Sequence, residues 1–176
     1  MALKSFRQYS EHDVVNLFGY HAGDTLAAGT VVKISEGVAL DNKGPVETMG
    51  AIGTSVNNTV SMRYGTRAKV VPITAKADVA LGVTLMAVAE VDENGELLKF
   101  NPRKAAEMGV VLKGQAIPVL TKGVVHITLA GSGAAGSAVR LSDSVDGGLT
   151  TAGDGTIVGK TLSAIVDGSA IVQLSF

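Results

Sequence analysis

The sequence of 176 residues contains no cysteine, which excludes disulfide bonds, thiolate metal ligands and a cysteine nucleophile. It has no run approaching the roughly 18 apolar residues that a membrane-spanning helix needs. The polar segment at residues 1–10 is not followed by the apolar region of a secretion signal. The sequence therefore predicts no membrane partner.

Charge is also scarce, because charged residues make up 18% of the sequence and the formal net charge is −1. Nucleic-acid binding depends on clusters of Lys and Arg that neutralise phosphates, and the sequence shows no such cluster. We therefore expect no nucleic-acid partner. Glycine, in contrast, is abundant at 22 residues, well above its usual share of about 7%. This abundance favours a chain with many tight turns.

Aromatic residues are few, and four of the seven (four Phe and three Tyr) lie within residues 1–22. Disordered tails lack aromatics, so this segment is not a typical tail. It is either the first strand or short helix of the core, or an arm that packs on another subunit or another protein. Aromatic side chains are favoured anchors for such binding. The second interpretation predicts a binding site formed by the large side chains of the arm: Phe6, Tyr9, Val14, Leu17, Phe18 and Tyr20.

Most of the sequence consists of short segments rich in β-branched and apolar residues, separated by turn-forming residues. In the last segment, Val172, Leu174 and Phe176 alternate with polar residues, which indicates a strand with one buried face. Clusters of Gly and Asp, which tolerate the backbone of tight turns, separate the predicted strands of this region. These strands are Ala138–Leu141, Leu149–Thr151, Thr156–Ile165 and Ala170–Phe176. Residues 131–176 are therefore predicted to form a compact antiparallel meander.

Upstream, two further strands are predicted at Gln115–Leu120 and Val124–Leu129. A hairpin turn beginning at Asp92 is expected to return Glu96–Phe100 beside Val83–Val91.

One segment carries the signals of a short helix. Asn101 can cap it, Pro102 suits its first turn, and Gly109 can end it. The whole pattern predicts an all-β fold, either a small antiparallel β-barrel or a β-sandwich, with this one helix and an N-terminal arm. The arm covers residues 1–22 and is followed by a β domain at residues 23–130. The meander covers residues 131–176 and is expected to pack on the same core as the β domain.

Two glycine motifs resemble nucleotide-binding loops. Gly131–Gly136 matches G-x-G-x-x-G, but a dinucleotide site needs a helix to begin there, and the residues that follow read as a strand and a turn. Gly159–Thr161 resembles the end of a phosphate-binding loop, but Asp154 stands where the first glycine belongs. We therefore predict no cofactor-binding residues.

A metal site or a catalytic site has equally little support in the sequence. His12, Asp13, His21 and Asp24 are interpreted as surface residues, because no rigid element fixes them as ligands. The acidic residues are scattered, mostly in turns, and no nucleophile motif occurs. The sequence therefore predicts no metal, no catalytic residues and no enzyme.

The C-terminal part resembles a known family. The order of Ala135–Leu141, Gly148–Thr151, Ile157–Leu162 and Ala170–Leu174 is similar to the strand-and-turn pattern of the small head-decoration, or cement, proteins of tailed bacteriophages. The resemblance covers roughly residues 80–176, while residues 1–75 go beyond the family pattern.

This resemblance implies a non-enzymatic structural protein of the virion. Such proteins bind the outer surface of an expanded capsid, with the major capsid protein as partner, often as homotrimers. They stiffen the shell, and assembly would take place in the host cytoplasm. The predicted arm would then bind the capsid or a sister subunit. Two alternatives stay open: another virion component, such as a tail or head fibre, and a β-sandwich module that binds a ligand.

Overall fold

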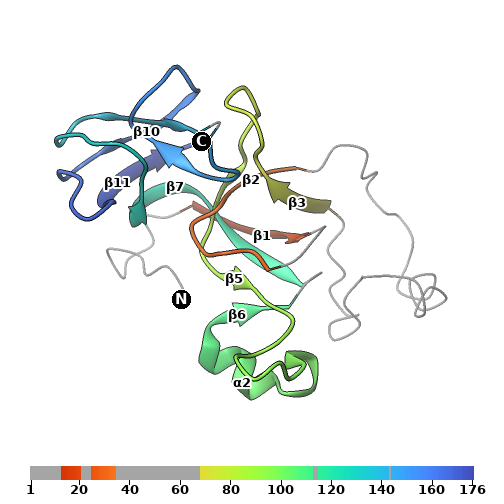
Figure 1. Cartoon of the computed structure of the whole chain (residues 1–176). Coiled ribbons are helices and arrows are strands. Elements are labelled where there is room, and N and C mark those ends of the chain that lie inside the picture. The colour runs from red at the N-terminus through yellow and green to blue at the C-terminus, as the bar shows by residue number, and fades with distance from the viewer. Residues whose placement is uncertain (1–12, 21–24, 35–67, 113–114, 143) are drawn as a thin grey trace.

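The structure, a computed structural model, describes residues 13–20, 25–34, 68–112, 115–142 and 144–176 (Figure 1). The strands are β1 (Asp13–Tyr20), β2 (Val31–Ile34), β3 (Ala68–Pro72), β4 (Gly82–Thr84), β5 (Ala87–Val88), β6 (Val110–Val111), β7 (Ala116–Thr128), β8 (Ala138–Leu141), β9 (Leu149–Thr150), β10 (Ile157–Thr161) and β11 (Ser169–Ser175). A short 3-10 helix, η2 (Leu98–Phe100), precedes α2 (Pro102–Met108), the one α-helix in these ranges. The predicted all-β class with one short helix is confirmed.

Five strands form a ring, which we call the strand ring. β1 pairs with β3, β3 with β2, β2 with β4, and β4 with β7. β7 in turn pairs with β1, so the pairings return to their starting strand. All of them are antiparallel except β1–β3. The sheet is therefore curled as in a small barrel, and these strands leave no long free edge.

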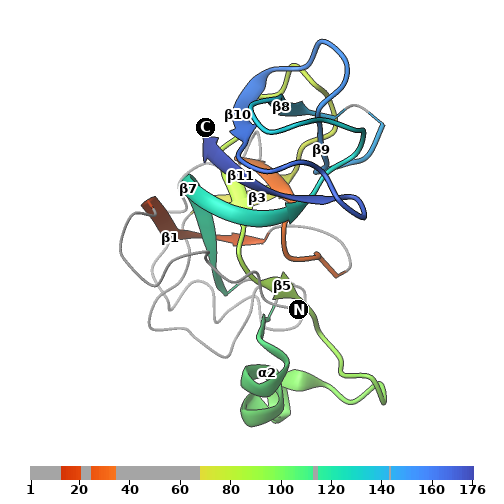
Figure 2. The same ribbon diagram turned by 90° about the vertical axis from the view of Figure 1, so that its left-hand side faces the viewer.

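The long strand β7 belongs to two parts of the sheet. Its first half lies in the strand ring, and its second half pairs with β11 from Lys122 to Thr128. The order then continues through β10 and β8 to β9 (Figures 1 and 2). The two separate strands predicted for this region are thus one continuous strand.

The C-terminal strands β8–β11 occupy the predicted segments and are antiparallel, although β10 ends earlier than expected. Their order is not that of consecutive strands, because β9 lies outside β8 and β10 pairs with the other side of β8. The last strand alternates as predicted, with Val172 and Leu174 fully buried and Gln173 exposed.

Strands β2 and β7 of the ring carry buried side chains on both faces, which explains their consecutive apolar residues. In β2, Val31 packs with the C-terminal strands, whereas Val32 packs in a second cluster with Val70, Ile117 and Val119. We call this second cluster the ring core. Successive side chains of a strand point to opposite faces, so β2 and β7 each contribute to both clusters. The C-terminal sheet therefore covers one face of the ring strands.

A backbone contact at Gly147 joins these two layers. Its N–H donates to the carbonyl of Ile73 at 2.9 Å, and its carbonyl accepts from the N–H of Val31 at 2.8 Å. Gly147 has a positive φ of 69°, and a Cβ atom there would lie 2.2 Å from Cγ2 of Thr30. Only glycine fits this position, because both the backbone conformation and the space exclude a side chain.

Candidate functional site

The most distinctive surface feature is the segment at residues 89–112, which we call the knob. It follows β5 and ends just after β6, and these two short strands pair in parallel at its base as a separate small sheet. In both views the knob, marked by α2, lies at the end of the molecule opposite to the C-terminal strands (Figures 1 and 2). A feature in this position can contact a partner while the rest of the surface stays free.

The knob has a small core of its own. Leu98, Ala105 and Leu112 are buried together, and Ala89, Met108 and Val110 pack against them. Even a core of this size favours one conformation of the knob, because each buried Leu contributes about 1.5–3 kcal/mol. The knob is therefore a structured element.

Helix α2 begins and ends as the sequence predicts. The side chain of Asn101 accepts a hydrogen bond from the N–H of Lys104 at 3.2 Å. Pro102 occupies the first turn, and Gly109 ends the helix with a left-handed backbone at φ 64°. These contacts satisfy donors and acceptors that a free helix end would leave unpaired.

The predicted strand at Glu96–Phe100 is wrong. A single bridge joins Val91 to Leu97, after which η2 begins. The physical reason is the helix that follows: Asn101 already caps α2, so the preceding residues turn into it instead of continuing a ladder. A hairpin turn at Asp92 does form, with the N–H of Asp92 donating to the carbonyl of Glu96 at 3.0 Å.

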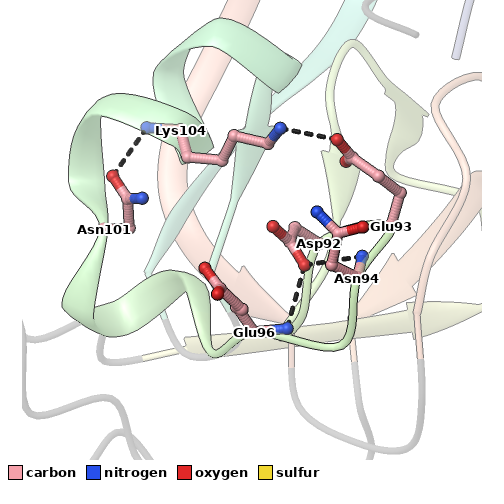
Figure 3. Close-up of polar contacts among 6 residues, drawn as sticks. All are labelled: Asp92, Glu93, Asn94, Glu96, Asn101 and Lys104. Atoms are coloured by element: carbon pink, nitrogen blue, oxygen red, sulfur yellow. Dashed lines mark hydrogen bonds and ion pairs between the residues drawn. The ribbon is translucent and has the colours of Figure 1, made fainter.

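Charged side chains fasten this turn to α2 (Figure 3). The carboxylate of Asp92 accepts the N–H groups of Asn94 at 2.8 Å and Glu96 at 2.9 Å. The Lys104 ammonium lies 2.6 Å from the Glu93 carboxylate. The hydrogen bond from the Glu96 N–H lowers the pKa of Asp92, and Lys104 lowers the pKa of Glu93 while its own pKa is raised. The Glu93–Lys104 pair thus links the turn to α2, while the Asp92 carboxylate closes the turn itself.

The knob exposes apolar side chains despite this order. Phe100 is 78% exposed, and Leu97 and Val91 are 45% and 41% exposed. The Lys99 ammonium lies 4.9 Å from the centre of the Phe100 ring. Single exposed apolar residues are common on protein surfaces. A Phe that is held out on an ordered segment, however, has the properties of a binding anchor, since burying it costs little conformational entropy.

Sequence reasoning missed Phe100 because it placed this residue in a strand. A local signal was available, since Phe100 directly precedes the helix cap. An apolar residue at that position often packs on the fifth residue after it, which here is Ala105. Ala105 is small and already buried in the knob core, and Phe100 remains in solvent.

The predicted arm residues are only partly described. Phe6 and Tyr9 lie outside the described residues. Val14 lies on β1 and is 38% exposed. Leu17, Phe18 and Tyr20 also lie on β1, whose backbone pairs with β3 and β7 of the same chain. Residues 13–20 are thus a strand of the sheet, while the binding role of the six residues stays a prediction.

Both glycine motifs are described by the structure, whereas most of the candidate metal ligands are not. Gly159–Thr161 belongs to β10, and Gly131–Gly136 leads into β8 instead of a helix, both as the sequence indicates. His12, His21 and Asp24 lie outside the described residues. Within the described ranges, no group of three or more His, Asp or Glu side chains is arranged to hold a metal ion. Of the helices described, none has the length and apolar character that crossing a membrane requires.

A second polar cluster lies in the turn between β3 and β4. The Asp78 carboxylate accepts hydrogen bonds from the Lys33 ammonium at 2.9 Å, the Thr74 N–H at 2.9 Å and the Ala75 N–H at 3.1 Å. The Lys33 contact, followed by that of Thr74, lowers the pKa of Asp78 to about 2. A shallow hollow beside this cluster is lined by Ile34 and Val79. These polar contacts close the turn and, through Lys33, link it to β2.

No protein-family model and no curated protein matches the sequence.

Proposed function

We propose that this protein is a structural component of a phage virion that binds the outer surface of the expanded capsid and stabilises it. The resemblance of residues 80–176 to head-decoration proteins motivates the proposal. The observation that supports it in the structure is an ordered knob that holds Phe100 out in solvent at 78% exposure.

The knob supplies one anchor for each copy. Burying a Phe side chain contributes about 1.5–3 kcal/mol, which alone gives only weak attachment. In a homotrimer, the second and third anchors bind as intramolecular events, so the total affinity can rise by orders of magnitude without any new contact. The arm residues Phe6 and Tyr9 are further proposed anchors, with the major capsid protein as their partner.

A cement protein has to be rigid to stiffen the shell that it binds. The two layers of this chain share strand β7 and the backbone contact at Gly147. Because the layers share one continuous strand, a load on one is carried directly into the other. This arrangement supports a stiffening role on a shell under internal pressure.

The proposal is tested by co-sedimentation of the purified full chain with expanded and unexpanded shells of the phage that encodes it. We expect saturable binding to expanded shells only, and a higher temperature of shell disruption after binding. Full-length Phe6→Ser/Tyr9→Ser protein tests the arm, and it is preferable to deleting residues 1–22, which would remove β1 from the strand ring.

Failure of the full chain to bind expanded shells at saturating concentration would refute the proposal. Assembly into rings or fibres would then favour the tail or head-fibre alternative. Stabilisation of an isolated monomer by a glycan would favour the ligand-binding module.

A further inference from the structure

We infer that strand β1 is exchanged between copies of this protein, so that β1 of one copy fills the slot between β3 and β7 of another. The inference specifies how the copies of the proposed oligomer would join. It is independent of capsid binding, because every contact that carries it lies between parts of this chain.

All described partners of β1 are distant in the sequence. Val15 pairs with Val119, and Phe18 pairs with both Ile117 and Ala68. Among the described strands, β1 therefore forms no hairpin with its neighbour in sequence. An element that makes only distant contacts can be supplied by a second copy without disturbing any local pairing.

The slot that β1 fills is a specific acceptor for a strand. Without β1, β3 and β7 would each present an unpaired edge on one side, above the ring core of Val70, Ile117 and Val119. Unpaired edges over apolar side chains readily accept another strand. The best-fitting strand is an identical one, because it restores the same hydrogen bonds.

The closure made by β1 is the least regular part of the ring. Its pairing with β7 shifts register twice, between Asp13 and Val14 and between Val15 and Phe18. Its pairing with β3 is parallel, and parallel pairing is slightly less stable per residue than antiparallel pairing. Among the described ring strands, register shifts and parallel pairing thus both fall on β1, although the pairings β2–β4 and β4–β7, with two residue pairs each, are shorter. In a cyclic oligomer, each copy could donate β1 to the next, which leaves no slot empty.

The absence of native cysteine permits a direct test by disulfide trapping. Asp13 of β1 and Lys122 of β7 are register partners, and both are exposed. Cα atoms of such partners lie about 4.5–5.5 Å apart, within the range that a disulfide spans. Full-length Asp13→Cys and Lys122→Cys chains, carrying tags of different size, are unfolded together, refolded and oxidised. Exchange predicts a disulfide-linked heterodimer on a non-reducing gel.

The matched control uses the same β7 residue and the opposite side of that strand. Ser175 of β11 is also exposed and is also a register partner of Lys122. Mixed Ser175→Cys and Lys122→Cys chains should give no heterodimer, because β11 stays within its own chain. The double variant Lys122→Cys/Ser175→Cys should give a monomer with an internal disulfide, which also reports correct folding.

A second pair, Gly19→Cys with Ala116→Cys, probes the other end of β1, where these residues are register partners. A heterodimer at either β1 pair, together with none in the control mixture, supports exchange. If neither β1 pair links two chains while the Lys122–Ser175 double variant closes internally, β1 stays in its own chain and the inference is wrong. No capsid enters this experiment, so its outcome is separate from that of the proposed function.

Discussion

Gly147 and Gly168 have nearly the same backbone conformation but different surroundings. Their φ angles are 69° and 70°, yet a Cβ atom would meet Thr30 at 2.2 Å in the first case and nothing within 4 Å in the second. A left-handed backbone costs a residue with a side chain about 1–2 kcal/mol. We expect Gly168→Ala to lower the free energy of unfolding by about that amount, and Gly147→Ala by at least about 2 kcal/mol more, because the clash adds to it. Urea denaturation measures both, and equal losses would show that Gly147 does not fix the layers.

Asp78 makes stability depend on pH at the acidic end. Its pKa falls from 3.8 to about 2 in the folded protein, so the folded state favours the charged carboxylate. The stabilisation is fully present above pH 3.8 and is lost as the pH falls through about 2. It amounts to about 2 kcal/mol by linkage. We expect the stability advantage of the native protein over Asp78→Asn to shrink by about this amount between pH 5 and pH 2. An advantage that stays constant over this range would rule out the ion pair with Lys33 as its source.

At the scale of elements, α2 depends on its cap. Replacing Asn101 by Ala removes the acceptor for the Lys104 N–H, and such a loss costs about 1 kcal/mol. We expect faster hydrogen exchange of the knob amides in Asn101→Ala, with β7 unchanged, since the knob has its own core. Asn101→Ser is the matched control, because Ser also accepts this bond and should restore slow exchange. Equal exchange in the Ala and Ser variants would mean that the side-chain cap does not hold the helix.

Elements with local signals were predictable, and those that depend on distant pairing were not. The helix Pro102–Met108 and strand Ala138–Leu141 were expected where they occur, because caps and turns act over a few residues. The strand ring could not be foreseen, since it depends on pairings such as Phe18 with Ala68 and with Ile117. The sequence predicts separate strands at Gln115–Leu120 and Val124–Leu129, but β11 pairs with β7 across Lys122–Gly123 and keeps the strand continuous.

The candidate site shows the same division between local and distant causes. The cluster of aromatics within residues 1–22 is evident from composition alone, but the pairing of residues 13–20 in the sheet depends on the fold. Phe100 was visible in the sequence as one of seven aromatics. Its position directly before the helix cap is a local signal, but its exposure depends on how the knob core packs around Ala105.

At the scale of the whole molecule, the proposed binding role of the knob can be separated from folding, because the exposed Phe100 contributes little to the folded core. Phe100→Ser should therefore leave the unfolding free energy within about 0.5 kcal/mol of the native value. The same substitution should weaken binding to expanded shells. For each Phe100 that contacts the shell, we expect the dissociation constant to rise roughly 10- to 150-fold, the equivalent of about 1.5–3 kcal/mol.

The matched control is Val79→Ser, which removes an apolar side chain that is 88% exposed in the turn between β3 and β4, outside the knob. If binding uses the knob as a specific anchor, Val79→Ser protein binds shells as the native protein does. Equal weakening by the two substitutions would indicate attachment through general surface hydrophobicity. Native binding by Phe100→Ser, with weak binding by Phe6→Ser/Tyr9→Ser, would move the anchor from the knob to the arm. The pair of variants therefore locates the face that the molecule turns toward its partner, because both proteins keep the same folded core.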